Sequence, residues 1–182
     1  YKWFYTSSEK LVVGGKNAEQ NEELLKKFKD LKTDRIVMHT AQPGSPFSII
    51  VADISSIKSS DIEEAAIFTA SFSQEWKKKK NKSEIHIFNL SQLYKLKAMK
   101  AGTWGVKGKI KRITVPLSLV LTKQSSKLRA VPESSTKSFF VKIIPGNIDK
   151  QQMVSKLQKI LPESFSKEEI LSALPAGGLS IK

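Results

Sequence analysis

Short runs of apolar residues separated by turn residues make up most of the chain, which is typical of β-strands joined by loops. Residues 3–13 hold two such runs around a polar turn and predict a pair of strands that ends at Gly14-Gly15. Further runs predict strands at residues 36–38, 47–51, 85–88, 113–121 and 139–144. Pro116 lies inside one of them and predicts an edge strand or a bulge, because proline has no amide hydrogen to donate.

Two longer segments repeat apolar residues at the spacing of a helix. We predict that the first begins at about Asn17, because Asn17 and Gln20 have the spacing of a capping box. The second is predicted from about Ser60, with Glu63 completing its capping box, and extends to Trp76. Alanines and serines on its apolar face indicate close packing against a sheet.

The last part of the chain is organised differently. Residues 123–137 are polar and predict an irregular linker, and two short helices are predicted to begin at Asp149 and Ser166. The order of elements predicts an α+β fold, in which a mainly antiparallel sheet packs against two helices and a small strand–helix–helix appendage follows. We therefore expect a main domain, a linker and an appendage packed on or beside the domain, at residues 1–122, 123–137 and 138–182.

Composition excludes several classes of chemistry. The 182 residues include no cysteine, which excludes disulfides, thiolate catalysis and cysteine-ligated zinc, and fits a reducing, cytoplasmic compartment. The two histidines are too few for a histidine-rich metal site, so we expect no metal site and no cofactor, although carboxylates could bind magnesium. No apolar run reaches the roughly 18 residues that cross a bilayer. The aromatic start lacks the features of a secretory signal.

The positive charge is distributed unevenly. Of the net charge of +14, residues 85–132 contribute +10, from ten Lys and Arg with no Asp or Glu, whereas the flanking segments mix both signs. A polyanion is the natural partner for such a segment: RNA, DNA or an anionic membrane surface. The alternative is a lysine-rich surface that only keeps the protein in solution, but this needs no segregation of charge.

Residues 104–112 are the most informative part of this segment. Alternation with a period of two predicts a strand whose inner face packs into the core and whose outer face presents a row of ammonium groups. The inner residues are Trp104, Val106 and Ile110, and the outer ones are Lys107, Lys109 and Lys111. Gly105 and Gly108 keep the backbone open to a partner.

Several motifs follow one another in a recognisable order. An aromatic strand with Trp3-Phe4 precedes Gly14-Gly15-Lys16-Asn17-Ala18, and His39 precedes a Pro-Gly turn at residues 43–47. Ser73 and Trp76 end the second helix. A basic hairpin motif then contains Gly102, Trp104, Gly108 and Lys109, and residues 140–146 and 174–178 form two further motifs in the tail.

These motifs together resemble, over essentially the whole chain, the C-terminal RNA-binding domain of the NFACT family of ribosome quality-control factors. The two tail motifs are similar to the C-terminal extension of archaeal members. The chain departs from the family at one place: the acidic residue expected four before His39 is Arg35, and Asp34 lies one residue earlier. The resemblance covers one domain of the family's longer proteins, so the chain corresponds to an excised domain or a stand-alone version.

The resemblance implies a non-catalytic module that binds ribosomal RNA or tRNA on stalled large ribosomal subunits, in the cytoplasm. Such a domain supplies RNA contact and not the extension of stalled nascent chains. The remainder of an NFACT protein is a further expected partner, and a membrane is not.

We predict that RNA phosphates are bound mainly by four side chains of the basic segment: Lys107, Lys109, Lys111 and Arg112. The alternative is an ordinary edge strand protected by lysines against aggregation. Seven further candidates are Trp104, Lys97, Lys100, Lys16, His39, Lys78 and Lys80. Four cations that would widen the surface are Lys95, Lys123, Lys127 and Arg129.

Each further candidate also has a structural interpretation. Trp104 either stacks on a base or packs in the core. Lys16 precedes a helix whose backbone amides could face a phosphate, but a simple turn fits as well. Lys78 and Lys80 suit the negative end of a helix dipole without any ligand. His39 either binds a phosphate or ribose or fixes its turn.

Two other functions stay open at the level of sequence. An RNA-processing or RNA-modifying enzyme could use His39 with a carboxylate such as Asp34 or Asp53 as acid and base, although no catalytic constellation is identifiable. A protein-interaction scaffold could use the basic face to dock an acidic partner or a membrane.

Overall fold

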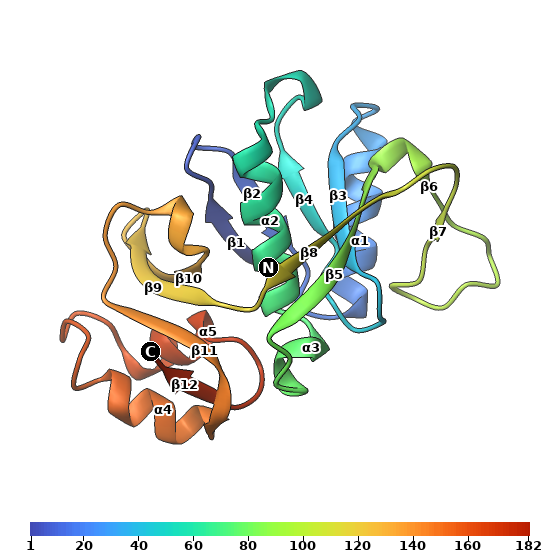
Figure 1. Cartoon of the computed structure of the whole chain (residues 1–182). Coiled ribbons are helices and arrows are strands. Elements are labelled where there is room, and N and C mark those ends of the chain that lie inside the picture. The colour runs from blue at the N-terminus through green and yellow to red at the C-terminus, as the bar shows by residue number, and fades with distance from the viewer.

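The computed structural model describes all residues, 1–182, and contains two antiparallel sheets and a small two-stranded hairpin (Figure 1). The larger sheet has the strand order β1-β2-β4-β3-β5-β8, and every neighbouring pair in it is antiparallel. Its strands are β1 (Lys2–Tyr5), β2 (Leu11–Gly14), β3 (Ile36–Thr40), β4 (Ser48–Val51), β5 (Lys82–Asn89) and β8 (Lys111–Pro116). The α+β prediction is therefore confirmed.

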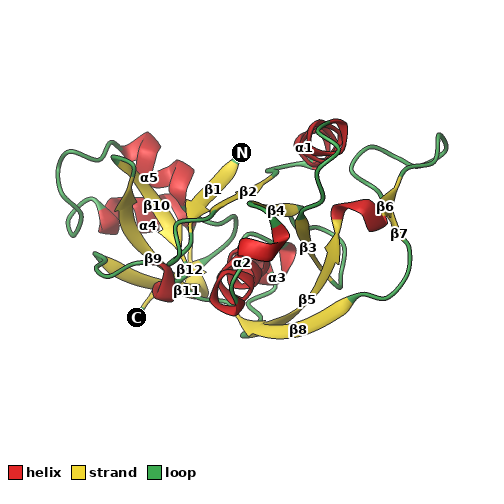
Figure 2. Ribbon diagram, turned by 90° about the horizontal axis from the view of Figure 1, so that it is seen from above, coloured by secondary structure: helices red, strands yellow, loops and turns green.

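Two helices cover opposite faces of this sheet (Figure 2): α1 (Ala18–Asp30) and α2 (Ser59–Ser71), the latter followed by the short α3 (Gln74–Lys77). Successive strand residues point to opposite faces. In β3, Met38 accordingly belongs to the core cluster that contains the alanines of α2, whereas Val37 belongs to the cluster that contains Leu24 and Leu25 of α1.

The helix starts follow local hydrogen bonding. Asn17 caps α1 as predicted, because its side chain accepts a hydrogen bond from the amide of Gln20 at 2.8 Å. The helix α2 begins at Ser59, next to the predicted start at about Ser60, but the predicted cap with Glu63 is wrong. The carboxylate of Asp61 accepts a hydrogen bond from the amide of Lys58 at 2.8 Å, so the capping pair is Lys58 and Asp61 instead of Ser60 and Glu63.

Asp61 can make this contact because tertiary structure fixes it. Its side chain is fully buried and also accepts hydrogen bonds from Thr6 and Ser8, in the turn between β1 and β2. Burial by itself would raise the pKa of Asp61. The hydrogen bonds from Ser8, Thr6 and the amide of Lys58 outweigh this effect, so the pKa of Asp61 lies below its ordinary value.

The second sheet has the order β10-β9-β11-β12. Its strands are β9 (Leu119–Gln124), β10 (Lys127–Val131), β11 (Val141–Ile148) and β12 (Leu179–Ile181), and its helices are α4 (Lys150–Leu157) and α5 (Lys167–Ala173). Single 3-10 turns lie at Ile54–Ser56, Leu90–Gln92 and Glu133–Ser135.

The irregular linker predicted at residues 123–137 is a β-hairpin over most of its length. Ser125 and Ser126 both have positive φ, 47° and 62°, which is the conformation of the tight turn that matches the twist of paired strands. The polar composition of the segment reflects an exposed turn. In β10, the side chains of Leu128 and Ala130, two residues apart, are buried in the core.

We call residues 119–182, with the second sheet and the helices α4 and α5, the C-terminal part. The two sheets share one hydrophobic core of 30 buried residues, so the C-terminal part packs directly on the larger sheet. Polar contacts join the same parts. The side-chain amide of Gln124 accepts from the amide of Tyr5 at 2.8 Å and donates to its carbonyl at 3.0 Å. The indole of Trp76 donates to the carbonyl of Gly178 at 3.0 Å.

The predicted strand at residues 104–112 is interrupted. A short hairpin of β6 (Leu93–Tyr94) and β7 (Gly105–Val106) projects from the sheet, and a turn follows before β8 begins. Gly108 has a φ of 76°, and the side chain of Gln92 donates to the carbonyls of Lys107 and Lys109, both at 2.8 Å. The alternation is thereby broken, and Val106 is 38% exposed instead of buried.

The prediction for Pro116 is confirmed, since it is the last residue of the edge strand β8. No helix combines the length and the apolar character that crossing a bilayer requires.

Candidate nucleic-acid interface

We call residues 95–112 the basic loop. It contains seven Lys and Arg and no carboxylate. Only Lys95 forms an ion pair, whereas the other six are exposed and have no acidic partner: Lys97, Lys100, Lys107, Lys109, Lys111 and Arg112. The loop projects from the sheet at the end opposite the C-terminal part (Figures 1 and 2).

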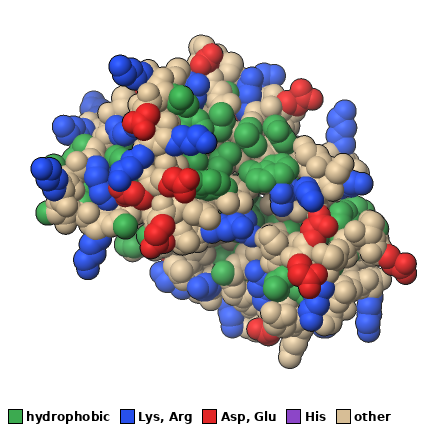
Figure 3. All heavy atoms as spheres, turned by 180° about the vertical axis from the view of Figure 1, so that it is seen from behind, with side chains coloured by type: hydrophobic (Ala, Val, Ile, Leu, Met, Phe, Trp, Pro, Cys, Tyr) green, Lys and Arg blue, Asp and Glu red, His purple; other side chains and the backbone are tan.

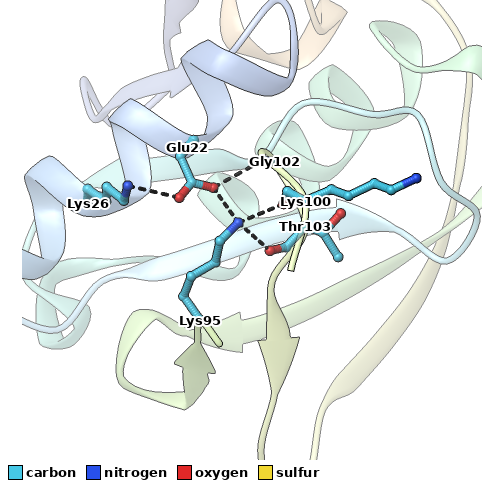
Figure 4. Close-up of polar contacts among 6 residues, drawn as sticks. All are labelled: Glu22, Lys26, Lys95, Lys100, Gly102 and Thr103. Atoms are coloured by element: carbon cyan, nitrogen blue, oxygen red, sulfur yellow. Dashed lines mark hydrogen bonds and ion pairs between the residues drawn. The ribbon is translucent and has the colours of Figure 1, made fainter. Parts of the chain in front are cut away.

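The basic loop is tied to α1 through one carboxylate (Figure 4). Glu22 accepts hydrogen bonds from the ammonium groups of Lys95 at 2.8 Å and Lys26 at 3.1 Å, and from the amide of Gly102 at 3.0 Å. The ammonium of Lys95 also donates to the carbonyls of Lys100 at 2.7 Å and Thr103 at 3.0 Å. Lys95 is therefore a structural cation.

The same contacts set the acidity of Glu22. Partial burial by itself would raise the pKa of Glu22, but the hydrogen bonds from Lys95, Lys26 and the amide of Gly102 lower it to about 2. Glu22 is therefore ionised throughout the physiological pH range.

The lysines predicted to share one face of a strand are distributed over a turn and two sheet faces. Lys107 and Lys109 flank the turn at Gly108, where Gln92 holds their carbonyls, and the ammonium of Lys107 lies 5.1 Å from the ring centre of Tyr94. Lys111 lies opposite Ile87, on the α2 side of the sheet, and its neighbour Arg112 lies on the α1 side.

On the α1 side, three basic residues form one row across adjacent strands. His39 of β3 lies opposite His86 of β5, and His86 lies opposite Arg112 of β8. The Nδ1 of His39 is 2.7 Å from the carbonyl of Thr40, so Nδ1 carries the proton, because a carbonyl only accepts. Burial lowers the pKa of His39, and the nearby His86 lowers it further, against the opposing effect of Thr40.

A cleft of about 860 Å³ opens beside this row. The predicted residues Lys16, His39 and Trp104 line it together, although they come from three separate segments. Asn21 shapes its rim, because it accepts from the amide of Phe47 at 2.9 Å and donates to the carbonyl of Ser45, which fixes the β3–β4 turn against α1.

Three basic lining residues of the cleft were not predicted as part of a site: Lys2, His86 and Lys150. Lys2 and Lys150 are 148 positions apart in the sequence, so no local pattern could have joined them. The alternation of β5 could have placed His86 on the same face as Arg112, had the register been known.

Comparison with known proteins gives the family. Residues 1–108 match the family described as the NFACT protein RNA binding domain, which is more than half of the chain. The chain belongs to this family.

One relative extends the likeness beyond residue 108. The archaeal Rqc2 homologue aRqcH of Methanocaldococcus jannaschii is 28% identical over 184 residues, which is 94% of this chain and 27% of that protein. The likeness therefore reaches into the second sheet, while the chain spans little more than a quarter of the relative's length.

A solved structure shows the same fold. The C-terminal part of the fibronectin/fibrinogen-binding protein from Streptococcus suis matches with a TM-score of 0.55 and 23% identity, covering 63% of this chain and 44% of that chain.

In this member of the NFACT family, the carboxylates considered as partners of His39 are engaged elsewhere. Asp34 accepts from the amide and the hydroxyl of Ser91 at 2.9 and 2.8 Å. Asp53 pairs with Arg35 at 3.1 Å, the residue at the family's acidic position. The acid–base pair of the enzyme hypothesis is thus not assembled, and no carboxylate lines the cleft.

The remaining candidate cations lie away from the basic loop. Lys78 pairs with Glu75 at 2.8 Å, beyond the end of α3, while Lys80 is exposed nearby. The cations of the β9–β10 hairpin are on the opposite side of the molecule (Figures 1 and 2). Among them, Arg129 lies 3.9 Å from the ring centre of Trp3. Lys123, Lys127 and Arg129 therefore do not widen the surface of the basic loop.

The face that carries α1 is shown in Figure 3, where Lys and Arg side chains are spread over the surface with carboxylates among them. On this face, the positive charge is consequently not one continuous patch. Trp104 is half-buried in the smaller core cluster, with the ammonium groups of Lys95 and Lys29 at 5.6 and 6.0 Å from its ring.

Proposed function

We propose that this chain is a non-catalytic RNA-binding module of ribosome quality control, which contacts ribosomal RNA or tRNA on stalled large ribosomal subunits in the cytoplasm. The observation that carries the proposal is the basic loop, with its six exposed cations that have no acidic partner. Membership of the NFACT family supports RNA as the polyanion. The likeness to an archaeal Rqc2 homologue supports the ribosome as the place of action.

The remainder of an NFACT protein is proposed as a further partner, because the chain corresponds to 27% of that archaeal relative. The exposed charged groups of the basic loop are all ammonium and guanidinium groups, and its tryptophan is half-buried. We therefore propose recognition of phosphates and of RNA shape by the loop, with Lys107, Lys109, Lys111 and Arg112 as the main contacts and Lys97 and Lys100 as flanking ones.

The test is RNA binding as a function of salt. For the unchanged protein we expect log K to fall linearly with log salt, by about 0.7–0.9 for each phosphate contact. The variant Lys107→Glu/Lys109→Glu/Lys111→Glu should lose binding to structured RNA while its melting temperature stays nearly unchanged, because these side chains are exposed. Filter binding and thermal unfolding measure the two quantities.

The matched control is Lys123→Glu/Lys127→Glu/Lys137→Glu, which makes the same change of charge at exposed positions of the C-terminal part. Equal losses of affinity in both variants would show that net charge alone binds RNA. Binding to an acidic protein but not to RNA would favour a docking scaffold instead.

A further inference from the structure

The cleft carries positive charge without matching negative charge. Its lining includes four lysines from separate elements, and no Asp or Glu: Lys2, Lys16, Lys77 and Lys150. None of these lysines forms an ion pair in the structure. A cluster of ammonium groups without counter-charge is unfavourable unless an anion joins it.

Lys2 is the most deeply placed of the four. Its ammonium donates to the carbonyls of Ser172 and Leu174 and lies 4.8 Å from the ring centre of Phe72. Lys150 donates to the same carbonyl of Leu174, at 3.3 Å, so the two ammonium groups are held close together. Burial, followed by repulsion from Lys150 and Lys16, lowers the pKa of Lys2 to about 7.

Aromatic rings also border the cleft. His39, His86, Phe88 and Trp104 line it, and the ring of His39 is supported by Phe47 at a centroid distance of 4.5 Å. The cleft therefore offers both cations to a phosphate and flat rings to a base. The volume of about 860 Å³ lies within the range of small-molecule sites.

We propose that the cleft binds the phosphate group of a single ribonucleotide, with the base against the rings of His39 or Trp104. The site shares residues 101–104 and 106 with the basic loop, but it contains none of the six exposed cations of that loop. The ribonucleotide is either free or the end of an RNA strand, and in the second case the inference rests on the RNA-binding function proposed above.

Calorimetric titration with adenosine 5′-monophosphate and with adenosine tests the site. We expect the monophosphate to bind and adenosine to bind at least tenfold more weakly. The variant Lys16→Met/Lys150→Met should weaken monophosphate binding at least tenfold. The control Lys127→Met/Lys156→Met, which removes the same charge at exposed positions outside the lining, should leave it unchanged. Equal affinities for the two ligands, or equal affinities of the two variants, would overturn the proposal.

Proton uptake gives a readout that a purely structural lysine would not produce. At pH 8 most of Lys2 is neutral in the free protein, so a bound phosphate should recruit a proton to it. The enthalpy of monophosphate binding should accordingly differ between Hepes and Tris at pH 8, and Lys2→Met should remove the difference. Binding without proton uptake would contradict the placement of the phosphate beside Lys2.

The two sources of the ribonucleotide are separated by RNA ends. Tighter binding of a 5′-phosphorylated oligoribonucleotide than of its 5′-hydroxyl form, lost in Lys16→Met/Lys150→Met, assigns the strand end. Equal binding of the two oligomers, with monophosphate binding retained, assigns a free ribonucleotide. RNA binding without monophosphate binding rejects the cleft alone, and monophosphate binding without RNA binding rejects only the proposed function.

Discussion

At the scale of single residues, one carboxylate determines where the basic loop lies. Glu22 is the acceptor for two ammonium groups and a backbone amide, and the loop contacts α1 through it. We predict that Glu22→Gln lowers the free energy of unfolding by roughly 1–3 kcal/mol, the range for leaving charged hydrogen-bond partners unsatisfied. Urea unfolding at pH 7 measures this, and Glu23→Gln on the same helix, exposed and outside this network, should change little.

The acid dependence of stability follows from the same group. The pKa of Glu22 is about 2 in the folded state, against an ordinary value of 4.5. Its contribution to stability is therefore fully present above pH 4.5 and is lost as the pH falls through about 2. As the pH falls from 4.5 to about 2, the free energy of unfolding should decrease less in Glu22→Gln than in the unchanged protein. Equal decreases in the two proteins would argue against the network.

At the scale of elements, the turn between β7 and β8 depends on Gln92. We predict that Gln92→Ala frees the backbone at Lys107 and Lys109, because both carbonyls lose their donor. Trypsin should then cleave at these lysines several times faster, while Gln152→Ala, an exposed position on α4, should leave the rate unchanged. Cleavage at an unchanged rate would mean that other contacts hold the turn.

The same turn shows why part of the sequence analysis failed. Alternation of apolar and basic residues at 104–112 predicted one strand, but only residues 105–106 and 111–112 are strand. The pattern contains no sign of a glutamine fifteen residues earlier that closes the turn between them. Similarly, the start of α2 follows Asp61, whose partners lie in the β1–β2 turn. Local caps such as Asn17 were predictable because both partners lie within four residues.

At the scale of the whole molecule, the two sheets should unfold together. Leu121 of β9 is fully buried in the core that both sheets share. We predict that Leu121→Ala costs about 2–5 kcal/mol. Leu121→Ala should also move the unfolding transition that tryptophan fluorescence reports to lower denaturant concentration, although all three tryptophans precede the second sheet in the sequence. Leu96→Ala, at a position 56% exposed, is the control, and two separate transitions would contradict the shared core.

The cleft belongs to the same scale, and its composition explains the limit of sequence reasoning. Lys16, His39 and Trp104 were candidates for separate reasons, but only folding brings them to one cavity with Lys2 and Lys150. The excess charge of residues 85–132 was readable in the sequence. Its division between the basic loop and the β9–β10 hairpin, on opposite sides of the molecule, follows from topology alone.

The contact between Gln124 and Tyr5 has a consequence for self-association. β1 is an outer strand, and outer strands present free N–H and C=O groups that can recruit another polypeptide. The side-chain amide of Gln124 occupies both groups of Tyr5, as a neighbouring strand would do. This glutamine therefore occupies, from within the same chain, backbone groups of an outer strand that would otherwise be open to another polypeptide.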